Sequence, residues 1–301
     1  MVMALLPDAM PRTGPFSLDD EDAYRRWRDA RLAAHPVSVG DLVVELKTPL
    51  APSPAEEAAL RDRVRRCNMA VFAGAAVGEP TQERMRAFGA RFGLNRLDTN
   101  MLADEDGITP LSVAADGPRR NYIPYTDKPL SWHTDGYYNT LDRQVRGLML
   151  YTVRDAAEGG DNALLDHAMA YIALRDADPG HIAALMRDDA MTIPPNAEPG
   201  QPPRPAQAGP VFSVDGAGNL HMRFTARTRS IVWADDPAVA VAVAALNALL
   251  NGDSPWILRA HMTPGQGLLC NNVLHNRTGF RDDPAAPRLV YRARYHDRIA
   301  D

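Results

Sequence analysis

From about residue 108 onward, short apolar runs alternate with Gly, Pro, Asn and Asp, as in strands joined by turns. Such runs occur at 147–153, 209–214, 268–270 and 289–295. Many short strands with frequent turns favour a β-sandwich or barrel over a parallel α/β sheet. Helices are expected to interrupt them at 168–175 and after Asp236. The chain is therefore predicted to be mainly β with flanking helices (α+β).

The first hundred residues are predicted to supply most of the flanking helices. Ser17 and Ser53 precede runs with acidic residues in the first turn, which is typical of capped helix starts. The expected elements are a helix after Ser17, a strand at 41–46, a helix at 54–67, a strand at 69–73 and a helix at 81–92.

We expect one domain with helical decorations. Residues 1–40 are predicted to form an N-terminal extension that packs on the core, and residues 41–301 to form the functional domain. Between 194 and 210 lie seven of the 25 prolines, which excludes a helix or a strand interior there. This segment is expected to be a loop, either a plain surface linker or a lid over a site.

Charge and composition exclude several functional classes. The formal net charge of −5 and the pI near 5.9 argue against a nucleic-acid partner. Two cysteines cannot make a disulfide framework or a thiolate zinc site, and they suggest a reducing compartment. The uncharged run at 237–250 is too short to span a bilayer, so a buried helix is expected. We therefore expect a cytoplasmic protein that binds a small molecule and no membrane, with a homo-oligomer favoured only by base rate.

A His-x-Asp pair, His133 and Asp135, offers the first candidate for chemistry. Residues two apart in a strand project to the same face, so imidazole and carboxylate can converge on one cation. With eight histidines in the chain, about one such pair is expected by chance. A surface His beside a solvated Asp is therefore the alternative for this pair alone.

A second histidine strengthens the metal hypothesis. His275 ends an apolar run at 268–274 and lies far from Asp135 in sequence, yet the two can meet in a closed β architecture. Two His and one carboxylate form the facial triad of non-haem Fe(II) oxygenases. Zinc could use the same three ligands, so the residues indicate a metal class and leave the metal open.

Arginines follow on the next expected strand. Arg288 and Arg292 share a face at alternating positions, with Arg294 beyond them. A buried guanidinium needs an anion, and bidentate pairing with a carboxylate is its strongest option. The alternative is an ordinary surface ion pair.

Taken together, these motifs resemble the taurine dioxygenase-like (TauD/TfdA) superfamily of Fe(II)- and 2-oxoglutarate-dependent dioxygenases. The resemblance rests on His133-Thr-Asp135, His275, Arg288 thirteen residues later, and the turn Gly159-Gly-Asp161. It spans roughly 60–298 and includes the run Pro-Gly-Gln-Gly at 264–267. Residues 125–135 and 159–166 are most similar to the γ-butyrobetaine and trimethyllysine hydroxylase branch. The chain lacks that branch's N-terminal cysteine/histidine module, and Asn162 stands where Thr or Ser is usual.

The resemblance implies a fold, cofactors and roles. The core is expected to be a double-stranded β-helix (jelly roll). His133, Asp135 and His275 are expected to hold Fe(II), and Arg288 the far carboxylate of 2-oxoglutarate, while Asn162 can still donate a hydrogen bond to a carboxylate. With O2, the expected reaction hydroxylates an unactivated C–H bond of a small polar metabolite and releases succinate and CO2.

The prime substrate is expected to be a betaine, an amino acid or a sulfonate-like compound. By resemblance, Arg292 would meet an anionic group, unless its role is to support neighbouring side chains. Tyr125, Tyr137 and Tyr138 flank the predicted metal ligands and could hold a quaternary ammonium by cation–π attraction, although packing is the commoner role of such tyrosines. Arg223 is a further candidate for an anion site.

Two other functions compete with the dioxygenase. A zinc-dependent hydrolase could use the same triad, but it predicts no role for Arg288 and lacks an identifiable general base. A non-catalytic jelly-roll binding protein would have no reason to keep all three ligands and Arg288. The remaining histidines are expected to be surface or packing residues, and His296 is expected to be exposed.

Overall fold

The computed structural model describes residues 11–99, 107–196 and 204–299 of the 301. Its contacts divide the chain into two compact units. Unit 1 comprises Met1–His35, Gly136–Gln144 and Leu165–Ile257, and unit 2 comprises Pro36–Asp135, Val145–Leu164 and Leu258–Asp301. Each unit is built from three separate segments of the chain, so neither corresponds to the predicted N-terminal extension or to the predicted functional domain. The boundary at residue 40 therefore stays a prediction.

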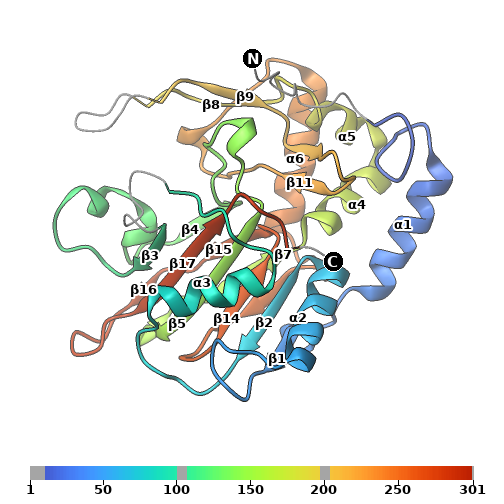
Figure 1. Cartoon of the computed structure of the whole chain (residues 1–301). Helices are drawn as coiled ribbons and strands as arrows, with labels where there is room; N and C mark the ends of the chain where they lie inside the picture. The colour runs from blue at the N-terminus through green and yellow to red at the C-terminus, as the bar shows by residue number, and fades with distance from the viewer. Residues whose placement is uncertain (1–10, 100–106, 197–203, 300–301) are drawn as a thin grey trace, which may run out of the picture. The chain divides into compact units, whose positions relative to one another are not determined.

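Unit 2 is predominantly sheet (Figure 1). Its six-stranded sheet has the order β1 (Val43–Glu45), β2 (Met69–Ala73), β14 (Gly267–Cys270), β5 (Gly147–Arg154), β17 (Leu289–Tyr295), β3 (Ile108–Leu111). The four-stranded sheet has the order β13 (Leu258–Ala260), β7 (Asn162–Leu165), β15 (Leu274–Arg277), β4 (Leu130–His133). A further pair joins β6 (Glu158–Gly159) to β16 (Phe280–Arg281). The single-turn helix η1 (Val39–Leu42) leads into β1, and η2 (Pro118–Asn121) and η3 (Ile123–Tyr125) lie between β3 and β4.

Two apolar layers hold unit 2 together. Val71, Leu148 and Leu268 of the six-stranded sheet pack in one cluster with Leu164 and Leu258 of the four-stranded sheet, so the two sheets face each other. The opposite face of the larger sheet is covered by α2 (Pro54–Cys67) and α3 (Gln82–Arg91), whose apolar side chains join a second cluster (Figure 1). This layering agrees with the expected mainly-β fold with flanking helices. The jelly-roll strand topology stays a prediction.

Local signals explain why α2 forms where the sequence predicts it. The Ser53 side chain accepts a hydrogen bond from the Glu56 amide, and the Glu56 carboxylate accepts one from the Ser53 amide at 2.6 Å. Pro54 occupies the first turn, where its lack of an N–H costs nothing. The helix ends at Cys67, and the residue that caps it, Asn68, takes the left-handed conformation with φ of 58°.

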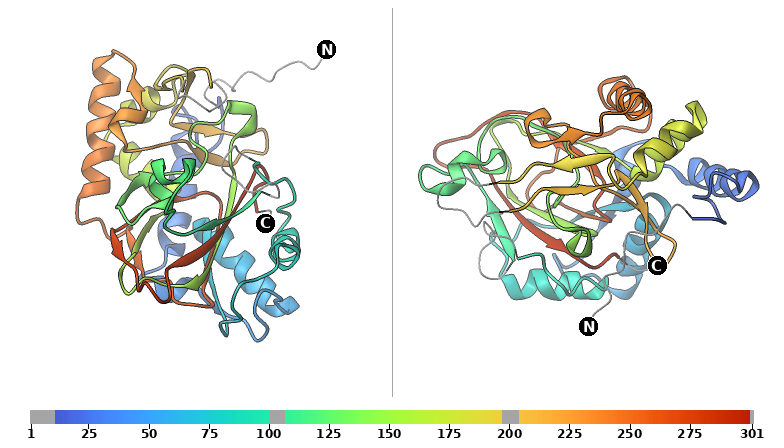
Figure 2. Two further views of the ribbon diagram at one scale, coloured as in Figure 1. Left: turned by 90° about the vertical axis from the view of Figure 1, so that its left-hand side faces the viewer. Right: turned by 90° about the horizontal axis from the view of Figure 1, so that it is seen from above.

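The described residues of unit 1 form four α-helices, two single-turn helices and several short strands. They are α1 (Glu21–Ala34), α4 (His167–Ala177), α5 (Pro179–Leu185), α6 (Pro237–Asn251), η4 (Leu141–Arg143), η5 (Thr228–Ser230), the sheet β12 (Val232–Trp233), β8 (Met191–Ile193), β9 (Gln207–Gly209), and the hairpin β10 (Phe212–Val214), β11 (Leu220–Met222). Helix α5, which the sequence did not predict, packs against α4 and α6 (Figure 2). No helix in the described part of the chain is long and apolar enough to cross a membrane.

Two expectations about unit 1 were wrong. The proline-rich segment 194–210 contains strand β9, because Gln207, Ala208 and Gly209 carry no proline and lie at the edge of their sheet. Residues 197–203 of that segment lie outside the described residues. Helix α6 is confirmed, but it is not buried all round: Val241 is 58% exposed, because only one face packs on the unit.

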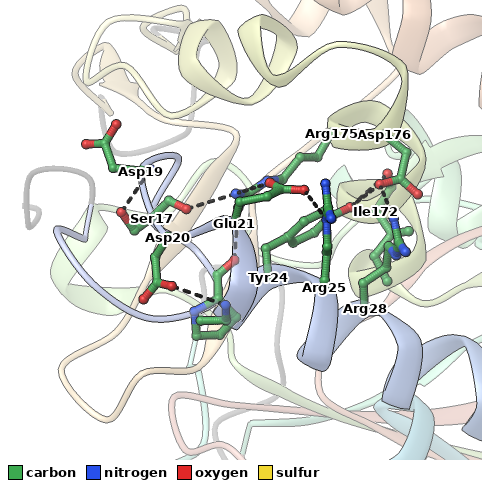
Figure 3. Close-up of polar contacts among 12 residues, drawn as sticks. Ser17, Asp19, Asp20, Glu21, Tyr24, Arg25, Arg28, Ile172, Arg175 and Asp176 are labelled. Carbon is green, nitrogen blue, oxygen red and sulfur yellow. Dashed lines mark hydrogen bonds and ion pairs between the residues drawn. The ribbon is translucent and has the colours of Figure 1, made fainter.

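The first helix of unit 1 is attached through polar contacts to α4 (Figure 3). The guanidinium of Arg175 donates to the carbonyls of Pro15 and Ser17, both at 2.9 Å, and lies 3.8 Å from the centroid of the Tyr24 ring. The Tyr24 hydroxyl in turn donates to Asp176 at 2.7 Å. These bonds tie the segment before α1 and α1 itself to the same helix.

Candidate active site

Two of the predicted metal ligands are direct partners across a pair of strands. Strand β4 runs antiparallel to β15, and His133 is paired with His275. Paired residues project to the same face, and the ring centroids are 4.3 Å apart. The sheet therefore joins two residues that lie far apart in the sequence.

The hydrogen bonds of these rings leave one nitrogen of each unused. Nδ1 of His133 lies 2.9 Å from the Ser131 carbonyl oxygen, and Nδ1 of His275 lies 3.0 Å from that of Val273. A carbonyl that accepts from Nδ1–H leaves the Nε2 lone pair available, as in most metal-binding histidines. Burial, together with neighbouring His275, lowers the pKa of His133 to about 3, so its imidazole is neutral.

Asp135 follows β4 and is held through its backbone by Asn272. The Asp135 amide donates to the side-chain oxygen of Asn272 at 2.8 Å, and the Asn272 amide group donates to the carbonyls of Asp135 and Val145. Asn272 adopts a φ of 52°, in the left-handed region that asparagine tolerates better than most residues. Sequence reasoning missed Asn272, because only the folded chain shows what this side chain binds.

The carboxylate of Asp135 faces two arginines of β17. One of its oxygens, Oδ1, lies 3.1 Å from Arg292 and 4.0 Å from Arg294. Burial raises the pKa of Asp135, but the two guanidinium charges outweigh it and hold the pKa below the ordinary value. The predicted shared face of β17 is thus confirmed for Arg292 and Arg294.

The side chains of His133, Asp135 and His275 are of the types that bind a divalent metal, although they do not lie close enough together to form a complete metal site. Among the described residues, no three His, Cys, Asp or Glu side chains meet closely enough to hold a metal ion together. Asp135 nevertheless keeps its second oxygen, Oδ2, buried and without a hydrogen-bond partner. Two imidazoles and a carboxylate match the facial triad of iron oxygenases, so the residues fit the predicted metal.

Arg288 lies apart from Arg292, just before β17. Its guanidinium is stacked over the Phe280 ring at 5.3 Å, and a Cβ built on Gly160 would lie 3.6 Å from its Nε atom. Within the described ranges, no carboxylate forms an ion pair with it, and burial lowers its pKa. Arg277 stacks on the same ring at 4.6 Å and donates to the carbonyls of Thr126 and Lys128. A half-buried, unpaired guanidinium is a natural anion-binding group.

The Gly-Gly-Asp turn lies beside this arginine. Gly159 has a φ of 72°, and a Cβ there would collide with the Gly279 carbonyl, so a side chain is excluded. Asp161 accepts a hydrogen bond from His261 at 2.8 Å, on the exposed side of the turn. The Asn162 side chain donates to the Asn276 carbonyl at 2.8 Å, one residue after His275.

A buried ion pair behind the site was missed by sequence reasoning. Arg294 lies 2.8 Å from Asp98, and each of the two side chains is only 4% exposed. His296 lies 3.7 Å from the same carboxylate and is 15% exposed, so the expectation that it is a surface residue was wrong. The sequence gives no sign of this pair, since Asp98 precedes Arg294 by almost two hundred residues.

The predicted substrate residues divide between the two units. Tyr125 is 3% exposed in unit 2 and packs with Leu111 and Val290. Tyr137, Tyr138 and Arg223 belong to unit 1, where the Tyr137 and Tyr138 rings meet edge to face at 5.3 Å. The Arg223 guanidinium donates to the carbonyls of Tyr137, Met191 and Gln207.

Two curated relatives of this chain share the name uridine-5'-phosphate dioxygenase. An uridine-5'-phosphate dioxygenase from Amycolatopsis sp is 31% identical over 176 residues, which cover 54% of this chain and 60% of the relative. One from Streptomyces sp is 31% identical over 215 residues, which cover 67% of this chain and 74% of the relative. The match thus spans less than two thirds of the first relative.

Solved structures share the fold at low sequence identity. An asparagine oxygenase, described in complex with Fe(II), 2S,3S-3-hydroxyasparagine and succinate, superposes with a TM-score of 0.57 at 13% identity. The likeness covers 82% of this chain and 81% of that one. At this identity the superposition supports the fold alone.

The family model described as taurine catabolism dioxygenase TauD, TfdA family matches residues 29–294, nearly the whole described chain. The match confirms the predicted superfamily, and the relatives named above agree with it in enzyme class. The predicted cofactors, iron and 2-oxoglutarate with O2, are those of this family. The chain therefore belongs to the TauD/TfdA dioxygenase family.

Proposed function

We propose that this protein is an Fe(II)- and 2-oxoglutarate-dependent dioxygenase that hydroxylates a small polar metabolite. The observation that carries the proposal is the cross-strand pair His133–His275, whose Nε2 atoms are unused, beside Asp135 with its unpartnered Oδ2. A metal held by these three atoms would keep three coordination positions for other ligands. Bound iron would supply the oxidising chemistry, in which 2-oxoglutarate and O2 yield succinate, CO2 and a hydroxylated product.

The residues around the triad would orient the reactants. Arg288 would form a salt bridge with the far carboxylate of 2-oxoglutarate, and the Phe280 ring beneath it would fix the plane of the guanidinium. Arg294 stays paired with Asp98, so its charge remains near Asp135 whichever group binds there. Burial of the histidines would exclude bulk water from the reacting centre.

The prime substrate we place first is uridine-5'-phosphate, because both relatives described above carry its name. The γ-butyrobetaine branch, together with amino acids and sulfonates, supplies the alternatives that the sequence suggested. We place the protein in the cytoplasm, because Cys67 and Cys270 are both free thiols.

The test is succinate formation from 2-oxoglutarate by protein loaded with Fe(II) without oxygen and then exposed to air. Uridine-5'-phosphate, a betaine, asparagine and taurine would be added singly. We expect one of them to raise succinate formation and to gain one oxygen atom by mass spectrometry. His133→Ala should abolish both Fe(II) binding and turnover, whereas His181→Ala, in helix α5, should change neither. Fe(II) binding that survives in His133→Ala would contradict the assigned triad.

A second variant isolates the role of Arg288. Loss of a charge-assisted bond to a carboxylate should raise the KM for 2-oxoglutarate by about tenfold to a hundredfold in Arg288→Ala. The analogue 2-oxobutyrate lacks the far carboxylate, so its KM should be the same in the variant and the parent. Arg259→Ala, an exposed arginine of β13, is the matched control. An equal rise in KM for 2-oxoglutarate and 2-oxobutyrate would mean that Arg288 does not bind the far carboxylate.

A further inference from the structure

Two arginines of unit 1, Arg204 and Arg223, are not neutralised by any acidic residue in the described part of the chain. Arg223 is 2% exposed, and its guanidinium donates to the carbonyl oxygens of Tyr137 at 2.8 Å and Gln207 at 2.6 Å. Nowhere in the described chain does an Asp or Glu form an ion pair with Arg223 or with Arg204. Carbonyl dipoles satisfy hydrogen bonds but do not cancel a charge. The pair therefore leaves two positive charges in a largely buried region.

Arg204 has hydrogen-bonding capacity to spare. One nitrogen, Nη2, donates to the Pro194 carbonyl at 2.8 Å, and the backbone is paired with Asn196. The other, Nη1, is buried and has no partner among the described residues. A buried donor without an acceptor is unfavourable, so a ligand that supplies an acceptor there would be stabilised.

Hydroxyl groups surround these charges. The side chains of Ser230 and Thr225 lie near the Tyr137 hydroxyl and favour its ionised form, and the Tyr137 ring packs edge to face on Tyr138. Both tyrosines are electrostatic neighbours of Arg204, and Arg204 in turn acts on Arg223. When Ser230 and Thr225 donate to the phenolic oxygen, the Tyr137 proton remains available to a ligand.

The chemistry of this cluster selects an anion. Burial and the charge of Arg204 lower the pKa of Arg223 to about 10, so the two guanidinium groups repel each other and both remain protonated at neutral pH. A quaternary ammonium would add to that repulsion, which argues against a cation cage at Tyr137 and Tyr138. A dianion with several acceptor oxygens would compensate both charges and accept from Nη1 and from the hydroxyls.

We propose that Arg204 and the Tyr137 hydroxyl, supported by the fixed charge of Arg223, bind the phosphate group of a phosphate monoester. This inference rests on the proposed function, because it assigns the part of the chain that recognises the prime substrate. Arg204 would contact the phosphate directly. Arg223, whose donors are engaged by carbonyls, would act through its charge and by holding the backbone of Tyr137 and Gln207.

The test is calorimetric binding to full-length protein loaded with Fe(II) and 2-oxoglutarate in the absence of oxygen, so that no turnover occurs. The probes are uridine-5'-phosphate, uridine and inorganic phosphate. We expect uridine-5'-phosphate to bind at least about tenfold more tightly than uridine, and inorganic phosphate to compete with it. Methanesulfonate, which carries one charge, should compete much less well.

The variant Arg204→Gln should weaken uridine-5'-phosphate binding by about tenfold to a hundredfold and leave uridine binding unchanged. Arg204→Lys should restore part of the loss, and Arg259→Gln is the control for removal of an exposed arginine. Arg223 is not the residue to change first, because its replacement would leave several buried carbonyl oxygens without their hydrogen-bond donor. Equal affinity for uridine-5'-phosphate and uridine, or an unaffected Arg204→Gln, would overturn the phosphate site.

The outcomes separate this site from the proposed function. Succinate formation with no phosphate-dependent binding overturns the phosphate site and leaves the dioxygenase intact. Phosphate-dependent binding lost in Arg204→Gln, with no succinate formed under any condition, overturns the proposed function and leaves the site. Methanesulfonate that competes as well as phosphate would show a site for one negative charge, and the phosphate assignment would then be wrong.

Discussion

At the scale of single residues, the ion pair of Asp98 and Arg294 shows how unit 2 keeps charges in its interior. Each side chain is 4% exposed, and the Asp98 amide also donates to the Arg294 carbonyl at 2.7 Å. Two charges removed from water are stable only as a pair. Their place beside Asp135 means that the carboxylate proposed to bind metal has a fixed positive neighbour.

Asp98→Asn should therefore destabilise the protein strongly, because it leaves the Arg294 charge buried without its partner. We expect the free energy of unfolding to fall by about 3 kcal/mol, the lower end of values for broken buried pairs. Glu158→Gln, which breaks the exposed pair with Arg281, should cost at most about 1 kcal/mol. Urea unfolding followed by circular dichroism measures both. Similar losses in the two variants would contradict the burial of Asp98.

Both thiols of unit 2 should be unreactive while the protein is folded. Burial raises the pKa of Cys270 to about 12, so almost no thiolate is present at neutral pH, and Cys67 is also buried. We expect a disulfide reagent such as Ellman's reagent to label neither cysteine at pH 7.5. In denaturant both should react within minutes. Fast labelling of the native protein would contradict the packing of both residues in the core between the two sheets.

At the scale of elements, the start of α2 gives a prediction with a defined pH dependence. The amides of Lys47 and Ser53 donate to Glu56 and lower its pKa below the ordinary value. A lowered pKa means that the carboxylate stabilises the fold at pH values above the ordinary glutamate pKa. This contribution disappears as the pH falls through the lowered pKa.

Glu56→Gln should accordingly be less stable than the parent at pH 7, and the difference should shrink as the pH falls below about 4.5, the ordinary glutamate pKa. Melting temperatures from pH 3 to 7 measure the effect. A pH-independent difference for Glu56→Gln would mean that its charge does not cap the helix.

Ser53→Ala should lower the free energy of unfolding by about 1 kcal/mol, because it removes the side chain that caps the start of α2.

At the scale of the whole molecule, the chain is built from two interleaved units, and the attachment of the N-terminal helix within unit 1 can be tested. Arg175 is buried, and it joins the carbonyls of Pro15 and Ser17 to α4 (Figure 3). Arg175→Gln should release the segment that contains α1. We expect chymotrypsin to cleave after Tyr24 and Trp27 at least about tenfold faster than in the parent, because local opening exposes those sites.

Arg25→Gln is the control, since Arg25 is exposed and its partner Glu21 lies on the same helix. It should leave the cleavage rate unchanged. Circular dichroism of the Arg175→Gln protein distinguishes release of α1 from unfolding of the unit. An unchanged cleavage rate in a folded Arg175→Gln protein would contradict the proposed attachment.

Elements whose signals are local could be predicted from the amino-acid sequence. Helix α2 begins after Ser53 and ends at Cys67 as predicted, and strand β2 has the predicted bounds 69–73, because caps and short apolar runs act over a few residues. The ordered motifs around His133, His275 and Arg288 also sufficed to identify the family.

Which of these residues come into contact depends on the folded chain. The partnership of His133 with His275 depends on the register between β4 and β15, and the pairing of Asp98 with Arg294 depends on chain segments almost two hundred residues apart. Strand β9 forms inside a proline-rich stretch because β8 provides a partner. Arg204 gains its significance from Arg223 and Tyr137, which the fold brings near it. Burial, long-range pairing and the pKa values that follow from them are properties of the folded surroundings, and no local pattern in the chain specifies them.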